Sequence, residues 1–144
     1  MDYKIEPTYK ISFKYRRVMV PFDGSGPSVN ALELALDWSL RYGSLITVVI
    51  ATPLSNGDTA HIERLVEKAR ATASKYGKTI DLKILEYDPI RSSAASTIVK
   101  EVLEGGYDAV IVGARGTTPL EDINLGSIAL SLIHNTPVTI VVIR

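Results

Sequence analysis

Short apolar runs alternate with amphipathic segments along the chain. Val18 to Phe22 is a run typical of a buried strand, and apolar residues spaced by three and four follow it from Val29 to Leu40, which predicts a helix. The pair of patterns repeats, with strands expected over 45–51, 80–84, 109–112 and 138–143 and helices over 58–76, 92–103 and 128–133. This alternation predicts a single-domain α/β fold of Rossmann-like type, an open parallel five-stranded sheet with helices on both faces.

Turn and cap residues mark the expected ends of the helices. Gly43 and Gly77 follow the last apolar positions of the first two helices, where a left-handed glycine commonly ends a helix. Asp58 precedes the second helix and Ser92 or Ser93 precedes the third, and these residue types favour the N-cap position.

The composition narrows the class of protein. The chain has 144 residues, of which 46% are hydrophobic and 22% charged, proportions typical of one soluble globular domain. It has no cysteine, which excludes disulfides, thiolate metal sites and cysteine nucleophiles. The longest apolar runs have about six residues, far fewer than the ~20 that a membrane-spanning helix needs. With no apolar signal sequence at the N-terminus, we expect a cytoplasmic protein that has no membrane partner.

Charge is distributed unevenly although the totals balance. Residues 1–17 carry five basic and two acidic residues, a net charge of +3, and residues 18–144 carry −3. An acidic body is a poor binder of polyanions, so we expect no nucleic acid partner. Ile11, Phe13 and Tyr15 alternate with polar residues. Residues 1–16 are therefore expected to form an arm that is either a solvated tail or an edge strand, ahead of a domain over 17–144.

The most informative stretch follows the fourth predicted strand. Gly113 and Gly116 would let the backbone approach a ligand closely, and Arg115 is the cation between them. Gly126-Ser127 leads directly into a helix, whose free N–H groups form an anion site. Together they predict a phosphate-binding loop at the carboxyl ends of the strands, where α/β sheets bind ligands. The alternative is that each glycine is only a turn residue or a helix cap.

Two motifs make a family resemblance visible. The spacing Gly113-x2-Gly116-x9-Gly126-Ser127 resembles the nucleotide-binding signature of the universal stress protein family. The segment from Val18 to Ser25 resembles the opening strand and Asp-Gly-Ser turn of that family. The resemblance extends over about residues 17–144.

The resemblance implies that the chain binds ATP, or AMP or ADP. Because ATP carries about four negative charges and the predicted loop offers one arginine and no P-loop lysine, we expect Mg²⁺ to bind with the phosphates. By the same resemblance, Asp23 would face the adenosine, Ile50 would pack on the base, and Gly126 and Ser127 would receive the phosphates. Several family members have a hydroxyl residue where Ala129 stands, so one phosphate contact would be missing here. The residues expected to contact the nucleotide are Pro21, Phe22, Asp23, Ile50, Val112, Gly113, Ala114, Arg115, Gly116, Gly126, Ser127, Ile128 and Ala129. Asp23 and Ser127 could alternatively serve only as helix caps.

Three functions remain open at this point. The first is a regulatory module that binds the nucleotide with little or no hydrolysis, because Asp23, Glu121 and Asp122 form no recognised acid–base pair. The second is a slow ATPase. The third is a stress-response interaction module that uses no nucleotide and forms a homodimer through the apolar strand from Val138 to Ile143, as the resemblance also suggests. His61 and His134 share no motif, so no protein-bound metal centre is expected.

Overall fold

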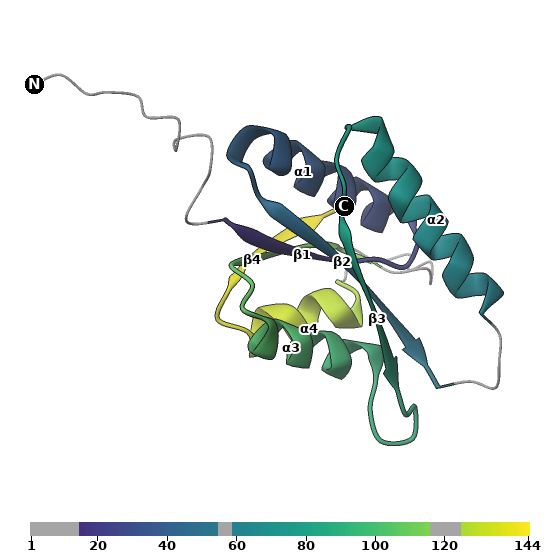
Figure 1. Cartoon of the computed structure of the whole chain (residues 1–144). Helices are drawn as coiled ribbons and strands as arrows, with labels where there is room; N and C mark the ends of the chain where they lie inside the picture. Colours follow the sequence, from purple (N-terminus) through teal and green to yellow (C-terminus); the bar gives the residue numbers. More distant parts are fainter. Residues whose placement is uncertain (1–14, 55–58, 116–124) are drawn as a thin grey trace, which may run out of the picture.

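The computed structural model describes residues 15–54, 59–115 and 125–144. Strands and helices alternate along the whole described chain, as the apolar pattern predicts (Figure 1). In chain order the elements are β1 (Arg17–Pro21), α1 (Gly26–Tyr42), β2 (Leu45–Pro53), α2 (Ala60–Lys75), β3 (Asp81–Tyr87), α3 (Ala94–Gly105), β4 (Ala109–Gly113), α4 (Ser127–Asn135) and β5 (Thr139–Ile143). The expected α/β class is confirmed.

The five strands form one parallel sheet in the order β3-β2-β1-β4-β5. β1 lies in the middle and pairs with β2 on one side and with β4 on the other, with Val18 opposite both Ile46 and Ala109. The chain runs outward from β1 to β3 and then crosses to β4. The carboxyl ends of β1 and β4 therefore form the switch point at which open α/β sheets have a crevice.

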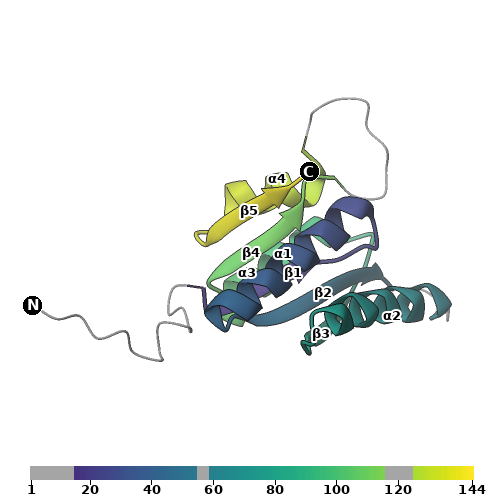
Figure 2. The ribbon, with the colours of Figure 1, turned by 90° about the horizontal axis from the view of Figure 1, so that it is seen from above.

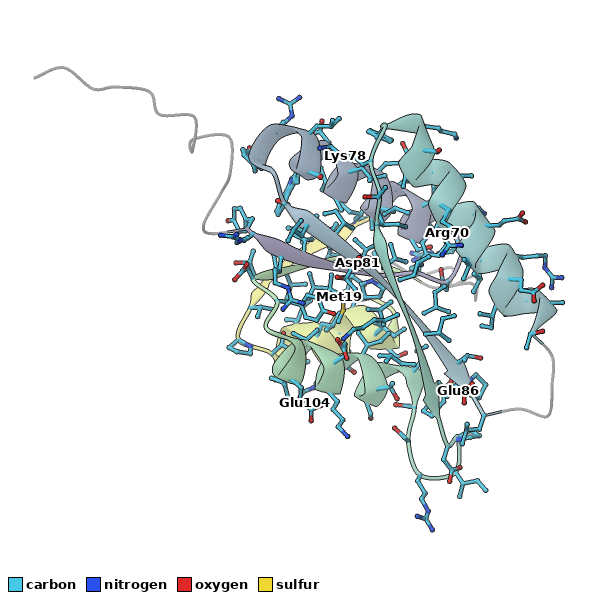
Figure 3. The ribbon with its side chains drawn as sticks, in the orientation of Figure 1. Met19, Arg70, Lys78, Asp81, Glu86 and Glu104 are labelled. Atoms are coloured by element: carbon cyan, nitrogen blue, oxygen red, sulfur yellow. The ribbon has the colours of Figure 1, made fainter. Side chains whose placement is uncertain are left out.

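Two helices cover each face of the sheet. α1 and α2 lie on one face and α3 and α4 on the other (Figures 1 and 2). Alternate strand residues point to opposite faces, so Val18 and Val20 join the core beneath α1 and α2 while Met19 joins the core beneath α3 and α4 (Figure 3). All three side chains are fully buried, which explains why β1 is apolar from Val18 onward.

Several predicted helix ends are confirmed, and others differ from the prediction. Gly43 ends α1 in the left-handed conformation with φ 72°, and the Ser93 hydroxyl accepts a hydrogen bond from the Ser96 N–H at 3.1 Å and caps α3. Thr59 is the N-cap of α2 and makes no side-chain cap bond. The proposed cap Asp58 lies outside the described residues.

The expected N-terminal strand falls mostly on residues 1–14, which lie outside the described residues. Tyr15 is described and is not part of a strand. Its ring packs against Trp38 with centroids 4.9 Å apart, and its carbonyl accepts a hydrogen bond from the Ser44 hydroxyl at 2.6 Å. These contacts attach the chain to the end of α1 just before β1 begins.

The helices within the described ranges are all too short or too polar to cross a membrane.

Candidate functional site

A cavity of about 420 Å³ lies beyond the carboxyl ends of β1, β2 and β4, at the switch point of the sheet. Strand ends, the N-terminal turns of three helices (α1, α3 and α4) and the β1–α1 loop supply its walls. The lining residues are Pro21, Phe22, Asp23, Ser28, Val49, Ala51, Ala94, Ile98, Val112, Gly113, Arg115, Gly126, Ser127, Ile128 and Ala129. The size is within the usual range of about 300–1,000 Å³ for small-molecule sites.

The β1–α1 loop holds Asp23 at the rim of this cavity. Its Oδ1 atom accepts a hydrogen bond from the Ser25 N–H at 2.9 Å, which closes a tight turn of the Asx type. Ser25, rather than Asp23, is the N-cap of α1, and its hydroxyl accepts from the Ser28 N–H at 3.4 Å. The alternative that Asp23 merely caps the first helix is therefore wrong.

Gly113 is a glycine because α1 packs closely against the end of β4. A Cβ atom at this position would lie 2.8 Å from the Pro27 Cβ atom and 3.0 Å from the Ser28 backbone nitrogen, both too close. The predicted reason, close approach to a ligand, is therefore not required to explain this residue. The glycine lets the first turn of α1 and the end of β4 form adjoining walls of the cavity.

The start of α4 offers backbone donors to the cavity. Gly126 is the N-cap in an extended conformation and supplies no side-chain cap bond, so Ser127 does not cap the helix either. The Gly126 N–H donates to the Ala114 carbonyl at 2.6 Å, and the Ala114 N–H donates to the Ile143 carbonyl at 2.6 Å. Within the described chain, the N–H groups of Ser127, Ile128 and Ala129 have no acceptor. Such donors, together with the helix dipole, favour an anion.

Most of the residues expected at the site are brought together here. The expected residues that line the cavity are Pro21, Phe22, Asp23, Val112, Gly113, Arg115, Gly126, Ser127, Ile128 and Ala129. Ala114 lies behind the wall, buried, and contributes through its backbone bonds. Gly116 lies outside the described residues.

Ile50 is the expected residue that the structure places elsewhere. Its side chain is 1% exposed and belongs to the core beneath α1 and α2, on the face of the sheet opposite to the side chains of Val49 and Ala51. Its neighbours Val49 and Ala51 line the cavity instead. A displacement of one residue along a strand moves the side chain to the other face, so Val49 and Ala51, and not Ile50, line the cavity.

Five lining residues were missed by sequence reasoning: Ser28, Val49, Ala51, Ala94 and Ile98. The period-two alternation of β2 would have identified Val49 and Ala51 once the face of the sheet was known. Ala94 and Ile98 come from the first turns of α3, which has no motif. Only the strand order shows that this helix lies against the site.

The lining has few charges. Among its described residues Arg115 is the only cation and Asp23 the only carboxylate. No group of three or more potential metal-ligating side chains occurs within residues 15–54, 59–115 and 125–144. The arrangement provides an apolar surface for a flat group, with anion-binding donors at the α4 end.

Among the described residues, the largest pKa shift belongs to a network away from the cavity. Burial, together with the hydrogen bond that the Tyr107 hydroxyl donates to Glu101 at 2.8 Å, raises the pKa of Tyr107 to about 12. Arg17 begins β1 at the opposite end of the strand from Pro21, and its guanidinium lies 5.0 Å from the centre of the Tyr107 ring. Lys83 also donates to Glu101 at 2.8 Å, so the network attaches α3 to the sheet. Perturbed pKa values often mark functional sites, but this one has a structural explanation.

Comparison with known proteins identifies the family of this chain. The model of the universal stress protein family matches residues 14–144. Universal stress protein MJ0531 of Methanocaldococcus jannaschii is 25% identical over 145 residues, covering 90% of this chain and 82% of the relative. The match therefore extends over most of both chains.

Solved structures show the same architecture. The universal stress protein of Archaeoglobus fulgidus in complex with dAMP has a TM-score of 0.72 and 19% identity, covering 92% of this chain and 100% of that one. A universal stress protein in complex with cAMP has a TM-score of 0.71 and 20% identity, covering 90% and 97%. At these identities the likeness concerns the fold, whereas the family match extends over almost all of the sequence. The chain belongs to the universal stress protein family.

Proposed function

We propose that this protein binds an adenine nucleotide in the cavity at the switch point and acts as a regulatory module with little or no hydrolysis. The observation that carries the proposal is the start of α4, where three consecutive N–H groups without acceptors in the described chain border an apolar cavity of nucleotide size. Solved structures of the same fold with bound cAMP and dAMP support an adenine nucleotide as the ligand.

The lining suggests an orientation for the ligand. The base packs against Val49, Ala51 and Ile98, which form the apolar part of the wall. The phosphates lie at the N–H groups of Ser127 and Ile128, near Arg115. Asp23 uses Oδ1 to accept from Ser25, and no described residue donates to its Oδ2 atom, which can accept a hydrogen bond from the nucleoside.

The negative charge of a triphosphate needs more positive charge than this lining supplies. ATP carries about four negative charges at neutral pH, against one arginine and a helix end among the described residues. Mg²⁺ typically keeps several water ligands and binds substrate phosphates. We therefore expect Mg²⁺ to enter with ATP through the phosphate oxygens.

Hydrolysis requires a group that orients the attacking water. Asp23 is the carboxylate available in the described lining, and one of its oxygens is already bonded within the loop. We therefore expect slow or absent turnover, because the described lining holds no second acid or base beside Asp23.

Calorimetric titration with AMP and with Mg-ATP tests the proposal. Gly126→Val places a branched side chain where the phosphates are expected and should abolish binding. Gly26→Val is the matched control, because Gly26 lies outside the cavity and a Cβ there meets nothing within 4 Å. Equal nucleotide affinity in wild-type and Gly126→Val protein would contradict the site assignment.

A dimeric interaction module is the second candidate function. β5 is an edge strand whose residues from Ile140 to Ile143 are only half-buried, and exposed apolar edges favour pairing with another chain. Sedimentation equilibrium measures this directly. A dimer that Val142→Lys dissociates, in a protein without any nucleotide affinity, would favour this function over the first.

A further inference from the structure

A second hollow lies on the other side of the β1–α1 loop. It is an open groove of about 600 Å³ between that loop and one face of α2. Asp23 borders both this groove and the main cavity, so the loop is a wall shared by the two. The groove is lined by Asp23, Gly24, Ser25, Gly26, Pro27, His61, Arg64, Leu65 and Lys68.

The α2 wall of the groove is basic. His61, Arg64 and Lys68 lie with the buried Leu65 on one side of the helix, within roughly 100° of its circumference. The acidic residues Glu63 and Glu67 fall on another side and are exposed. Charge is thus segregated along α2, with its positive side toward the groove.

This segregation has an energetic cost. Arg64 and Lys68 are four residues apart, a spacing at which like charges repel each other on a helix. In the described chain no carboxylate forms an ion pair with either residue or with His61. An anion in the groove would remove the repulsion.

The opposite wall adds to the positive potential. It contains the N-terminus of α1, which has no acidic residue in its first turn. Lys68 donates a hydrogen bond from Nζ to the Gly24 carbonyl at 2.7 Å and so holds this wall against α2. Asp23 is the single carboxylate of the lining, and its Oδ1 atom is bonded within the loop.

We propose that this groove is a second anion site, which binds a phosphate group separately from the nucleotide cavity. Three observations converge on it: a hollow, a basic stripe on α2 that forms no ion pair within the described chain, and the positive end of α1. Arg64 provides a planar fork of donors suited to phosphate oxygens. Because the groove and the cavity share one loop, a phosphate here lies directly behind Asp23.

The test is an NMR titration of the amide signals of the full chain at low salt, with inorganic phosphate and O-phosphoserine as separate probes. We expect saturable shifts at Ser25, Gly26 and residues 61–68, with a dissociation constant of about 1 mM or below for the better probe. Tighter binding of phosphate would identify a free ion as the ligand, and tighter binding of phosphoserine a phosphate ester.

Two substitutions on α2 give the test its specificity. Arg64→Gln should weaken binding roughly tenfold, the usual effect of losing a charged hydrogen-bond donor. Arg70→Gln is the matched control, since Arg70 is also exposed on α2 but lies outside the groove (labelled in Figure 3). Both changes are at exposed positions, so neither should affect folding.

Three results would overturn the proposal: no saturable shift, shifts confined to residues 126–129, or equal weakening by both substitutions. The nucleotide proposal fails separately, because it predicts shifts at residues 126–129 with AMP whatever happens at α2.

Discussion

At the scale of single residues, the shape of the site depends on small residues at places where two elements pack closely together. Gly113 shows this clearly, because the space that a side chain would need is already filled by Pro27 and Ser28 of α1. The glycine was predictable from the sequence as part of a motif. The reason for the glycine could not be predicted, because it is a tertiary contact with α1, whose residue Pro27 lies 86 positions earlier in the chain.

Gly113→Ala should therefore destabilise the protein even without ligand. We expect a loss of about 1–3 kcal/mol in the free energy of unfolding, typical of overpacking, measured by urea denaturation. Gly26→Ala is the control at a glycine with open space and should stay within about 0.5 kcal/mol of wild type. An unchanged midpoint for Gly113→Ala would show that α1 does not press on β4 as described.

Two adjacent positions in β2 separate core packing from binding. Ala51→Leu fills the cavity and should reduce nucleotide affinity by at least tenfold with little loss of stability. Ile50→Val removes one buried methyl group and should cost about 0.5–1.5 kcal/mol of stability while leaving affinity unchanged. Calorimetry and urea unfolding of both variants check this. The opposite pattern would restore the original assignment of Ile50 to the base.

Tyr107 makes stability depend on pH in the alkaline range. Its pKa is about 12 in the folded state against 10.0 for an ordinary tyrosine, so the unfolded chain loses this proton first as the pH rises. The contribution of Tyr107 is present below about pH 10 and is lost between pH 10 and 12. Thermal unfolding across this range should show a steeper decline for wild type than for Tyr107→Phe. Parallel declines would contradict the raised pKa.

At the scale of elements, local signals in the sequence predicted the helix and strand types well. Gly43 and Ser93 lie at helix ends as expected, because left-handed glycines and serine caps act through their immediate backbone neighbours. The start of α2 was harder to predict, because its N-cap residue Thr59 makes no side-chain hydrogen bond to the helix. The face of β2 that lines the site also escaped prediction, because alternation alone does not tell which face is which.

The cap of α3 gives an element-scale prediction. Ser93→Ala removes the acceptor of the Ser96 N–H and should cost about 1 kcal/mol of stability, while Ser93→Asp should retain most of it. Because Ala94 and Ile98 of the first turns line the cavity, Ser93→Ala should also weaken nucleotide binding modestly. Chemical denaturation checks the first effect. Equal stability of the alanine and aspartate variants would argue against the cap.

At the scale of the whole molecule, strand order creates the site. β1 and β4 are neighbours although about 90 residues separate them, and their adjacent ends bring the Asp23 loop and the start of α4 to one cavity. The number and type of elements were predictable from the apolar pattern. The resemblance and the general rule for open sheets predict that the Asp23 loop and the start of α4 meet at one site. The contribution of α3 to that site could be seen only in the folded structure.

The most direct test of the account is a crystal structure of the protein grown with AMP or Mg-ATP. We expect a phosphate within hydrogen-bond distance of the Ser127 and Ile128 N–H groups, and the base against Val49 and Ala51. Nucleotide bound only elsewhere, or a cavity closed by its own side chains with saturating nucleotide present, would contradict it.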